Sequence, residues 1–113
     1  MYTNLGLIGN PLSHTFSPFI HNYFLYKTGI CGGYTCYDIE SYELEDIILM
    51  FQRYHFTGVN VTVPYKQAVM DYCAELDITA QNIGAVNTLH FTDNGIIGHN
   101  TDIFGFHMML ETS

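Results

Sequence analysis

The amino-acid sequence predicts an α/β fold, a three-layer sandwich built on a mostly parallel, mixed sheet. Three observations carry this prediction. Short apolar runs of strand length alternate with amphipathic segments of helical spacing. Serine, proline and glycine lie where such elements are expected to begin and end. The 113 residues contain no internal repeat and have the length of one domain.

Two strand and helix pairs are predicted in the first half of the chain. Residues 5–9 form an apolar run before Gly-Asn-Pro, which indicates a buried strand followed by a loop. Ser17 and Pro18 favour the start of a helix as N-cap and first helical residue. The aromatic and β-branched run 33–38 predicts a second strand, and Ser41 is the expected N-cap of the next helix. That helix has one apolar face, made by Leu44, Ile47, Ile48 and Phe51.

The third predicted strand, residues 59–63, alternates valine with asparagine and threonine, so that one face is apolar and the other polar. Pro64 is expected to end this strand and to begin a helix, because proline cannot donate to a strand ladder but suits the first helical turn. A short helix over residues 79–83 is predicted to end at Gly84.

A β-hairpin is predicted next. Residues 85–91 read as a strand, Asp-Asn-Gly at 93–95 as a tight turn, and residues 96–99 as the returning strand. This antiparallel strand makes the predicted sheet mixed. The run Asn-Thr-Asp at 100–102 is expected to cap a last helix, inside which the sequence stops.

The charge balance argues against several classes of partner. Eleven acidic and three basic residues give a net charge of -8, which disfavours binding to nucleic acid or to an anionic membrane. The permanent cations are Lys27, Arg53 and Lys66. No signal peptide and no membrane-spanning stretch is recognisable, so a cytoplasmic protein is expected. A homodimer is compatible with the sequence, although no particular residue argues for it.

Neither a metal site nor a disulfide framework is predicted. The three cysteines, Cys31, Cys36 and Cys73, include no C-x-x-C pair and are expected to be reduced. The six histidines show no metal-binding spacing. No G-x-G-x-x-G motif follows a predicted strand, so no dinucleotide site is expected in this chain.

Lys66 is the first candidate for chemistry. In the first turn of a helix it would lie against the positive end of the helix dipole, where acidic residues are preferred. A cation held there tends toward a lowered pKa and so toward acid or base catalysis. The alternative is a solvated lysine at an exposed helix end. Asp102 follows another predicted strand and would meet Lys66 at one sheet edge as its partner, or else serve only as a helix N-terminal residue.

Several short polar residues are candidates for ligand binding. Thr15 and Ser17 bring hydroxyls to a helix N-terminus, where a carboxylate would be held, although capping and loop chemistry also explain them. Asn60, Thr62 and Asn87 lie on strands or at their ends, and each is equally explained by an ordinary solvent-facing position.

Four motifs in this order resemble the N-terminal, substrate-binding domain of the shikimate dehydrogenase family. They are GNPLSHTFSP at 9–18 with His-Asn at 21–22, NVTVPYK at 60–66, GAVNTL at 84–89, and GHNTD at 98–102 with Gly105. They spread over nearly the whole chain, which makes the set far more specific than any one of them. The resemblance implies the aminoacid dehydrogenase-like N-terminal fold.

The resemblance also implies an NADP-linked, reversible reduction of 3-dehydroshikimate to shikimate in aromatic amino-acid biosynthesis. Lys66 would exchange the proton at the reacting oxygen, and Asp102 would orient Lys66 and bind the substrate. The other implied substrate contacts are Thr15 and Ser17 for the carboxylate, and Asn60, Thr62, Asn87 and Asp102 around the ring hydroxyls. Hydride transfer to a carbonyl leaves an alkoxide that needs such a proton donor.

The chain departs from the family pattern in two ways. Thr15 replaces the first serine of the family's serine pair, which leaves open a quinate/shikimate dehydrogenase. The family binds its nucleotide on a C-terminal Rossmann domain, to which nothing here corresponds. We therefore expect residues 1–100 to be the substrate-binding catalytic domain and 101–113 to begin the helix leading to that domain, in a truncated chain that is inactive alone. A stand-alone ligand-binding module is the alternative from another functional class.

Overall fold

The structure is a computed structural model that describes residues 3–12 and 32–101. Three of the predicted site residues, Thr15, Ser17 and Asp102, lie outside the described residues. The predicted helix that begins at Ser17 and the predicted last helix lie outside them as well, so the third layer of the predicted sandwich is not described.

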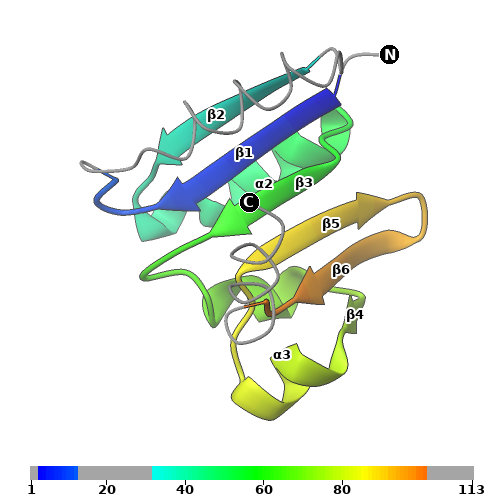
Figure 1. Ribbon diagram of the computed structural model, residues 1–113. Helices are drawn as coiled ribbons and strands as arrows, with labels where there is room; N and C mark the ends of the chain where they lie inside the picture. Colours follow the sequence, from blue (N-terminus) through cyan, green and yellow to red (C-terminus); the bar gives the residue numbers. More distant parts are fainter. Residues whose placement is uncertain (1–2, 13–31, 102–113) are drawn as a thin grey trace, which may run out of the picture.

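The centre of the fold is a six-stranded mixed sheet with the strand order β2-β1-β3-β5-β6-β4 (Figure 1). β1 pairs in parallel with β2 and β3, β4 pairs in parallel with β6, and β5 is antiparallel to both of its neighbours. One strand, β5, therefore runs against the other five, and the predicted mostly parallel, mixed sheet is confirmed. The strands are β1 (Thr3–Gly9), β2 (Gly32–Asp38), β3 (Gly58–Val61), β4 (Glu75–Leu76), β5 (Thr88–Thr92) and β6 (Gly95–His99).

The described helices are short except for one. They are η1 (Ser41–Glu43), α2 (Leu44–Arg53), η2 (Ala68–Tyr72) and α3 (Ile78–Ile83). The predicted N-cap at Ser41 is wrong: the N-cap of α2 is Glu43, and Ser41 is the first residue of η1. Glu40 caps η1, and its side chain and that of Glu43 each accept from the other's backbone N–H. α3 is flanked by its N-cap Asp77 and its C-cap Gly84, whose φ of 76° suits glycine.

The hydrophobic core lies on one face of the sheet, beneath α2. Ile48 and Phe51 of α2 are almost completely buried, as are Val59 and Leu89 of the sheet. The ring of Phe51 lies 4.7 Å from that of Phe56, measured between centroids. Figure 1 shows α2 crossing behind β1 and β3. The apolar face predicted for α2 is therefore the face that packs against the sheet.

The segment after β3 differs from the prediction. The strand ends at Val61, two residues early, and Val63 is exposed. Pro64 does not begin a helix: it lies in a turn, with a cis peptide bond between Val63 and Pro64, and the short 3-10 helix η2 starts only at Ala68. Thr62 N bonds to Ile8 O of β1 at 3.0 Å, and Tyr65 N bonds back to Thr62 O at 3.1 Å across the turn.

Candidate active site at the carboxyl edge of the sheet

The reversed direction of β5 brings its amino end to the edge where β3 and β6 end. Asn87, just before β5, joins the two: its carbonyl accepts from Val61 N at 2.8 Å, and its N–H donates to His99 O at 2.9 Å. Carboxyl ends of strands are where ligands bind in α/β sheets. Asn87 thus lies in the middle of the edge where a site is expected.

A backbone hydrogen bond brings Lys66 close to Asn87. Its carbonyl accepts a hydrogen bond of 2.8 Å from Val86 N, next to Asn87 in the chain. The residue is partly exposed and belongs to the turn before η2, not to the first turn of a helix. Lys66 therefore does not lie against a helix dipole, contrary to the prediction, because η2 is a five-residue 3-10 helix that starts two residues later. Its position at the sheet edge does not depend on a helix dipole.

Thr62 lies beside the end of β1. A Cβ built on Gly9 would come within 2.4 Å of Thr62 Cγ2 and 3.1 Å of Val63 O. Asn10 N donates to Val63 O at 3.0 Å, which joins the segments that follow β1 and β3. Glycine at position 9 is what allows this approach, because any side chain there would displace Thr62.

Asn60 lies on the face of the sheet opposite the α2 side. Its Nδ2 donates to the hydroxyl of Tyr34 on β2 at 2.8 Å, and its Oδ1 accepts from Thr88 Oγ1 at 3.4 Å. Tyr34, which is buried, reaches over β1 to make the first bond. Burial raises the pKa of Tyr34, while the hydrogen bond with Asn60 acts in the opposite direction. The tyrosine is therefore a neutral hydroxyl at physiological pH.

The side chain of Asn87 is held on the same face. Its Oδ1 accepts from Thr88 Oγ1 at 3.1 Å, from Thr101 N at 3.1 Å and from Thr101 Oγ1 at 3.4 Å. Thr101 directly precedes Asp102 in the chain. The backbone that leads to Asp102 is thus tied to Asn87, although the carboxylate itself lies outside the described residues.

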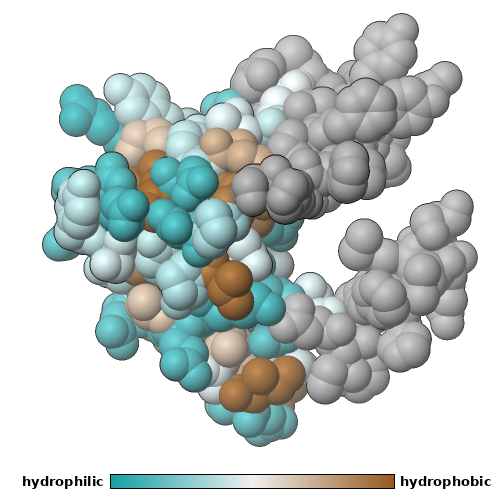
Figure 2. All heavy atoms as spheres, turned by 90° about the vertical axis from the view of Figure 1, so that its left-hand side faces the viewer, coloured by the Kyte–Doolittle hydropathy of each residue, from teal (hydrophilic) through white to brown (hydrophobic). Residues whose placement is uncertain are grey.

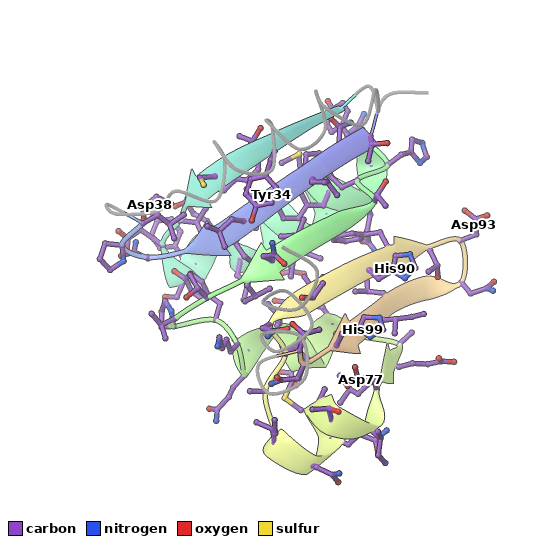
Figure 3. The ribbon with its side chains drawn as sticks, in the orientation of Figure 1. Tyr34, Asp38, Asp77, His90, Asp93 and His99 are labelled. Atoms are coloured by element: carbon purple, nitrogen blue, oxygen red, sulfur yellow. The ribbon has the colours of Figure 1, made fainter. Side chains whose placement is uncertain are left out.

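A second set of contacts holds the end of β6. Asp77 Oδ2 lies 3.1 Å from His99 Nδ1 and accepts from Asn100 N at 3.4 Å. Asn100 is buried, and its Nδ2 donates to Ala85 O at 2.9 Å. Figure 3 shows Asp77 beside His99 at this end of the sheet, with Tyr34 on the viewer's face. These bonds tie the end of β6 to Asp77 and to Ala85, two residues before Asn87.

The structure therefore brings four predicted site residues, Asn60, Thr62, Lys66 and Asn87, to one edge of the sheet. Sequence reasoning missed two hydrogen-bonding partners of the asparagines, Tyr34 and Thr88. The alternation of Asn60 between two valines already predicted its polar face, but its partners depend on strand order and register.

The described part of this edge combines polar surface with separate apolar patches (Figure 2). A cavity of about 170 Å³ borders the asparagine network and includes Tyr34, Asn60 and Thr88 in its lining. Within residues 3–12 and 32–101, no three His, Cys, Asp or Glu side chains group as metal ligands. No helix in these ranges is long and apolar enough to cross a membrane.

The sequence of this chain was compared with protein families and with known proteins. Residues 7–89 match the family model described as the shikimate dehydrogenase substrate binding domain. The shikimate dehydrogenase (NADP(+)) of Streptococcus mutans is 46% identical over 112 residues, which are 98% of this chain and 39% of that protein.

Solved structures show the same likeness. The chorismate mutase/shikimate 5-dehydrogenase fusion protein of Clostridium acetobutylicum is 40% identical with a TM-score of 0.90, over 99% of this chain and 41% of that one. Shikimate 5-dehydrogenase of Listeria monocytogenes, solved with shikimate and NAD, is 33% identical with a TM-score of 0.89, over 97% of this chain and 38% of that one. The chain thus spans about 40% of the length of such relatives.

Proposed function

This chain belongs to the shikimate dehydrogenase family, as its substrate-binding domain, and from that premise we propose that the whole protein reversibly reduces 3-dehydroshikimate to shikimate with NADP. The observation that carries the proposal is the gathering of Asn60, Lys66 and Asn87, from two separate motifs, around the end of β3. Such an edge suits a small ring that carries several hydroxyl groups.

Lys66 is the proposed proton donor and acceptor. When bound, NADPH would supply the hydride to the ring carbon, and NADP⁺ would accept it in the reverse direction. As the carbonyl carbon gains a hydride, the carbonyl oxygen gains negative charge, and the Lys66 ammonium gives it a proton; in the reverse direction the neutral amine takes the hydroxyl proton. Asp102 is proposed to orient the Lys66 side chain.

Substrate binding is assigned to short polar side chains. Thr15 and Ser17 are proposed to hold the carboxylate of the substrate, and Asn60, Thr62 and Asn87 its ring hydroxyls, together with Asp102. Support for the second group is its position: Asn60 and Asn87 share the hydroxyl of Thr88, and Thr62 follows β3 directly. Amides and hydroxyls both donate and accept, as recognition of a polyhydroxylated ring requires.

The nucleotide is proposed to bind outside this chain. β1 is followed by Asn10, Pro11 and Leu12, not by a glycine-rich turn, so these residues do not fit a dinucleotide. Residues 1–100 are proposed as the catalytic substrate domain, and 101–113 as the start of a helix leading to an NADP-binding Rossmann domain. The net charge of -8 disfavours nucleic acid as a partner. A small-molecule partner and a cytoplasmic location are proposed.

Shikimate added to the purified chain is expected to shift the backbone amide signals of Lys66, Asn87 and Thr62 in heteronuclear NMR spectra. The reason is that these residues surround the proposed site, while His55 and Asp93, at the opposite edge, should not respond. Benzoate, which has the carboxylate but no ring hydroxyls, is the control ligand. An absence of shifts at millimolar shikimate, or shifts confined to the opposite edge, would contradict the proposed site.

The purified 113-residue chain is expected to bind substrate weakly without turning it over. No described residue forms a nucleotide site, so hydride transfer lacks its donor. The measurement is NADPH oxidation with 3-dehydroshikimate, with the whole protein as positive control, and quinate as a second substrate to separate the quinate/shikimate alternative. Turnover by the chain alone would refute the proposal that the nucleotide binds outside this chain.

A further inference from the structure

We infer that the hydroxyl of Thr88 is a positioning group that sets the orientation of both asparagines in the proposed site. The inference rests on the proposed function, because it gives those asparagines a substrate to meet. Thr88 itself is not placed in contact with substrate. It acts through Asn60 and Asn87, whose amide groups it holds on one face of the sheet.

The geometry follows from the register of β5. Thr88 is the first residue of this strand and pairs with Asn60 on β3 and with His99 on β6. Paired residues on neighbouring strands point to the same face. The Oγ1 atom of Thr88 consequently lies between two amide oxygens, 3.1 Å from Asn87 Oδ1 and 3.4 Å from Asn60 Oδ1.

The orientation of the Asn87 amide is determined by its other contacts. The backbone N–H of Thr101 can only donate, so the group it meets at 3.1 Å must be the amide oxygen. Thr88 therefore donates to the same oxygen, and the NH₂ end of Asn87 points away from both threonines.

Asn60 has the matching arrangement. Its oxygen is turned to Thr88 and its NH₂ group donates to the Tyr34 hydroxyl at 2.8 Å. A threonine hydroxyl carries one hydrogen, so at any moment Thr88 donates to one of the two oxygens or is shared between them. A ligand that donates to one asparagine oxygen leaves the Thr88 hydrogen for the other. The Thr88 hydroxyl thus holds the orientation of both amide groups, while its single hydrogen adapts to the bound substrate.

The test uses Thr88→Val in the whole protein, with Thr88→Ser as the conservative variant. Valine keeps the shape and the strand preference but removes the hydroxyl. The KM for shikimate is expected to rise about three- to tenfold, the range of one hydrogen bond, with kcat nearly unchanged, which indicates lost binding and not lost chemistry. Thr88→Ser should restore the KM. Thr88→Ala removes the same hydroxyl and replaces the valine variant if that one fails to fold.

The matched control is Thr92→Val on the same strand. Thr92 Oγ1 donates to Gly95 O at 2.7 Å and accepts from Asn94 N at 3.2 Å in the hairpin turn. This variant therefore also loses the hydrogen bonds of a threonine hydroxyl, but at the far end of β5. It should lower the unfolding temperature and leave the KM unchanged. A similar KM for Thr88→Val and wild type, or equal KM effects of both valine variants, would overturn the inference.

A double-mutant cycle distinguishes positioning of the asparagines by Thr88 from a nonspecific destabilisation of the site. If Thr88 acts through Asn87 and Asn60, Thr88→Val should have little further effect on KM in a protein that carries both Asn60→Ala and Asn87→Ala. An undiminished effect would refute action through the asparagines. A wild-type protein without shikimate dehydrogenase activity would instead overturn the proposed function, and this inference with it.

Discussion

Lys66→Ala in the whole protein is expected to lower kcat by a factor of about 10² to 10⁴, the usual contribution of a positioned acid or base. KM for shikimate should change much less, because alanine removes the proton donor while the hydroxyl and amide contacts remain. The carbonyl of residue 66 still accepts from Val86 N, so the local backbone keeps its hydrogen bond. Steady-state kinetics in both directions, with shikimate and with 3-dehydroshikimate, measure the effect.

Arg53→Ala is the matched control for the loss of one cation. Arg53 is exposed in the last turn of α2, on an element that covers the opposite face of the sheet from Asn60. Its kcat should stay within about twofold of wild type, since long-range charge effects are screened by salt. If Lys66→Ala instead weakened substrate binding as much as turnover, Lys66 would be a binding residue and the proton donor would lie elsewhere.

Gly9→Ala is expected to destabilise the fold by about 1–3 kcal/mol, the usual cost of overpacking, and to raise the KM for shikimate as well. The added Cβ would lie 2.4 Å from Thr62 Cγ2 and 2.8 Å from Leu12 Cδ2. Thr62 must then move away from the end of β1, and a proposed substrate contact moves with it. Denaturant unfolding and steady-state kinetics measure the two effects.

Gly58→Ala serves as the control for Gly9→Ala, because a Cβ at position 58 finds its nearest neighbour, Leu89 O, at an ordinary 3.4 Å. It adds the same methyl group to the same sheet without a close contact. Equal unfolding midpoints for the two variants would mean that the end of β1 has room for a side chain, and that the packing described for Thr62 is wrong.

The parts of the fold that depend on local periodicity were predictable. Val59 and Val61 alternate with polar residues and are buried, while Ile48 and Phe51 follow helical spacing and face the sheet. Gly84 ends α3 with the positive φ expected of a C-terminal glycine. In each case the residues that set the structure are neighbours in the sequence, so pattern alone was sufficient.

Other features depend on distant partners and were not predictable. β4 is only two residues long and is held by bonds on either side of it, from Ala74 N to Ile96 O and from Asp77 N to Gly98 O. The early end of β3 likewise coincides with the turn at residues 63–64, which is closed by a hydrogen bond from Tyr65 N to Thr62 O. Proline preference could not distinguish a helix start from the turn that Pro64 occupies.

In the candidate site, too, some features were predictable from the sequence and others depend on distant partners. The rule that ligands bind at carboxyl ends of strands predicted the edge on which Lys66 lies, although the helix dipole invoked for it is absent. Asn87 was predicted as a substrate contact only through the family resemblance, and its link to Asn60 through Thr88 requires the register of β5 against β3. No pattern within one strand contains that information.

The reversed strand has a consequence for how the protein tolerates change. Because β5 starts and β6 finishes at the site, the hairpin is anchored by both of its ends there, while its tip at Asp93 and Asn94 points to the opposite side of the molecule. The tip is exposed and bonds mainly to itself, through Thr92 and Gly95. Insertions, labels or crosslinkers placed at residues 93–94 would thus leave the geometry around Asn87 intact, giving a fixed attachment point for immobilising or tracking the protein while it binds ligand.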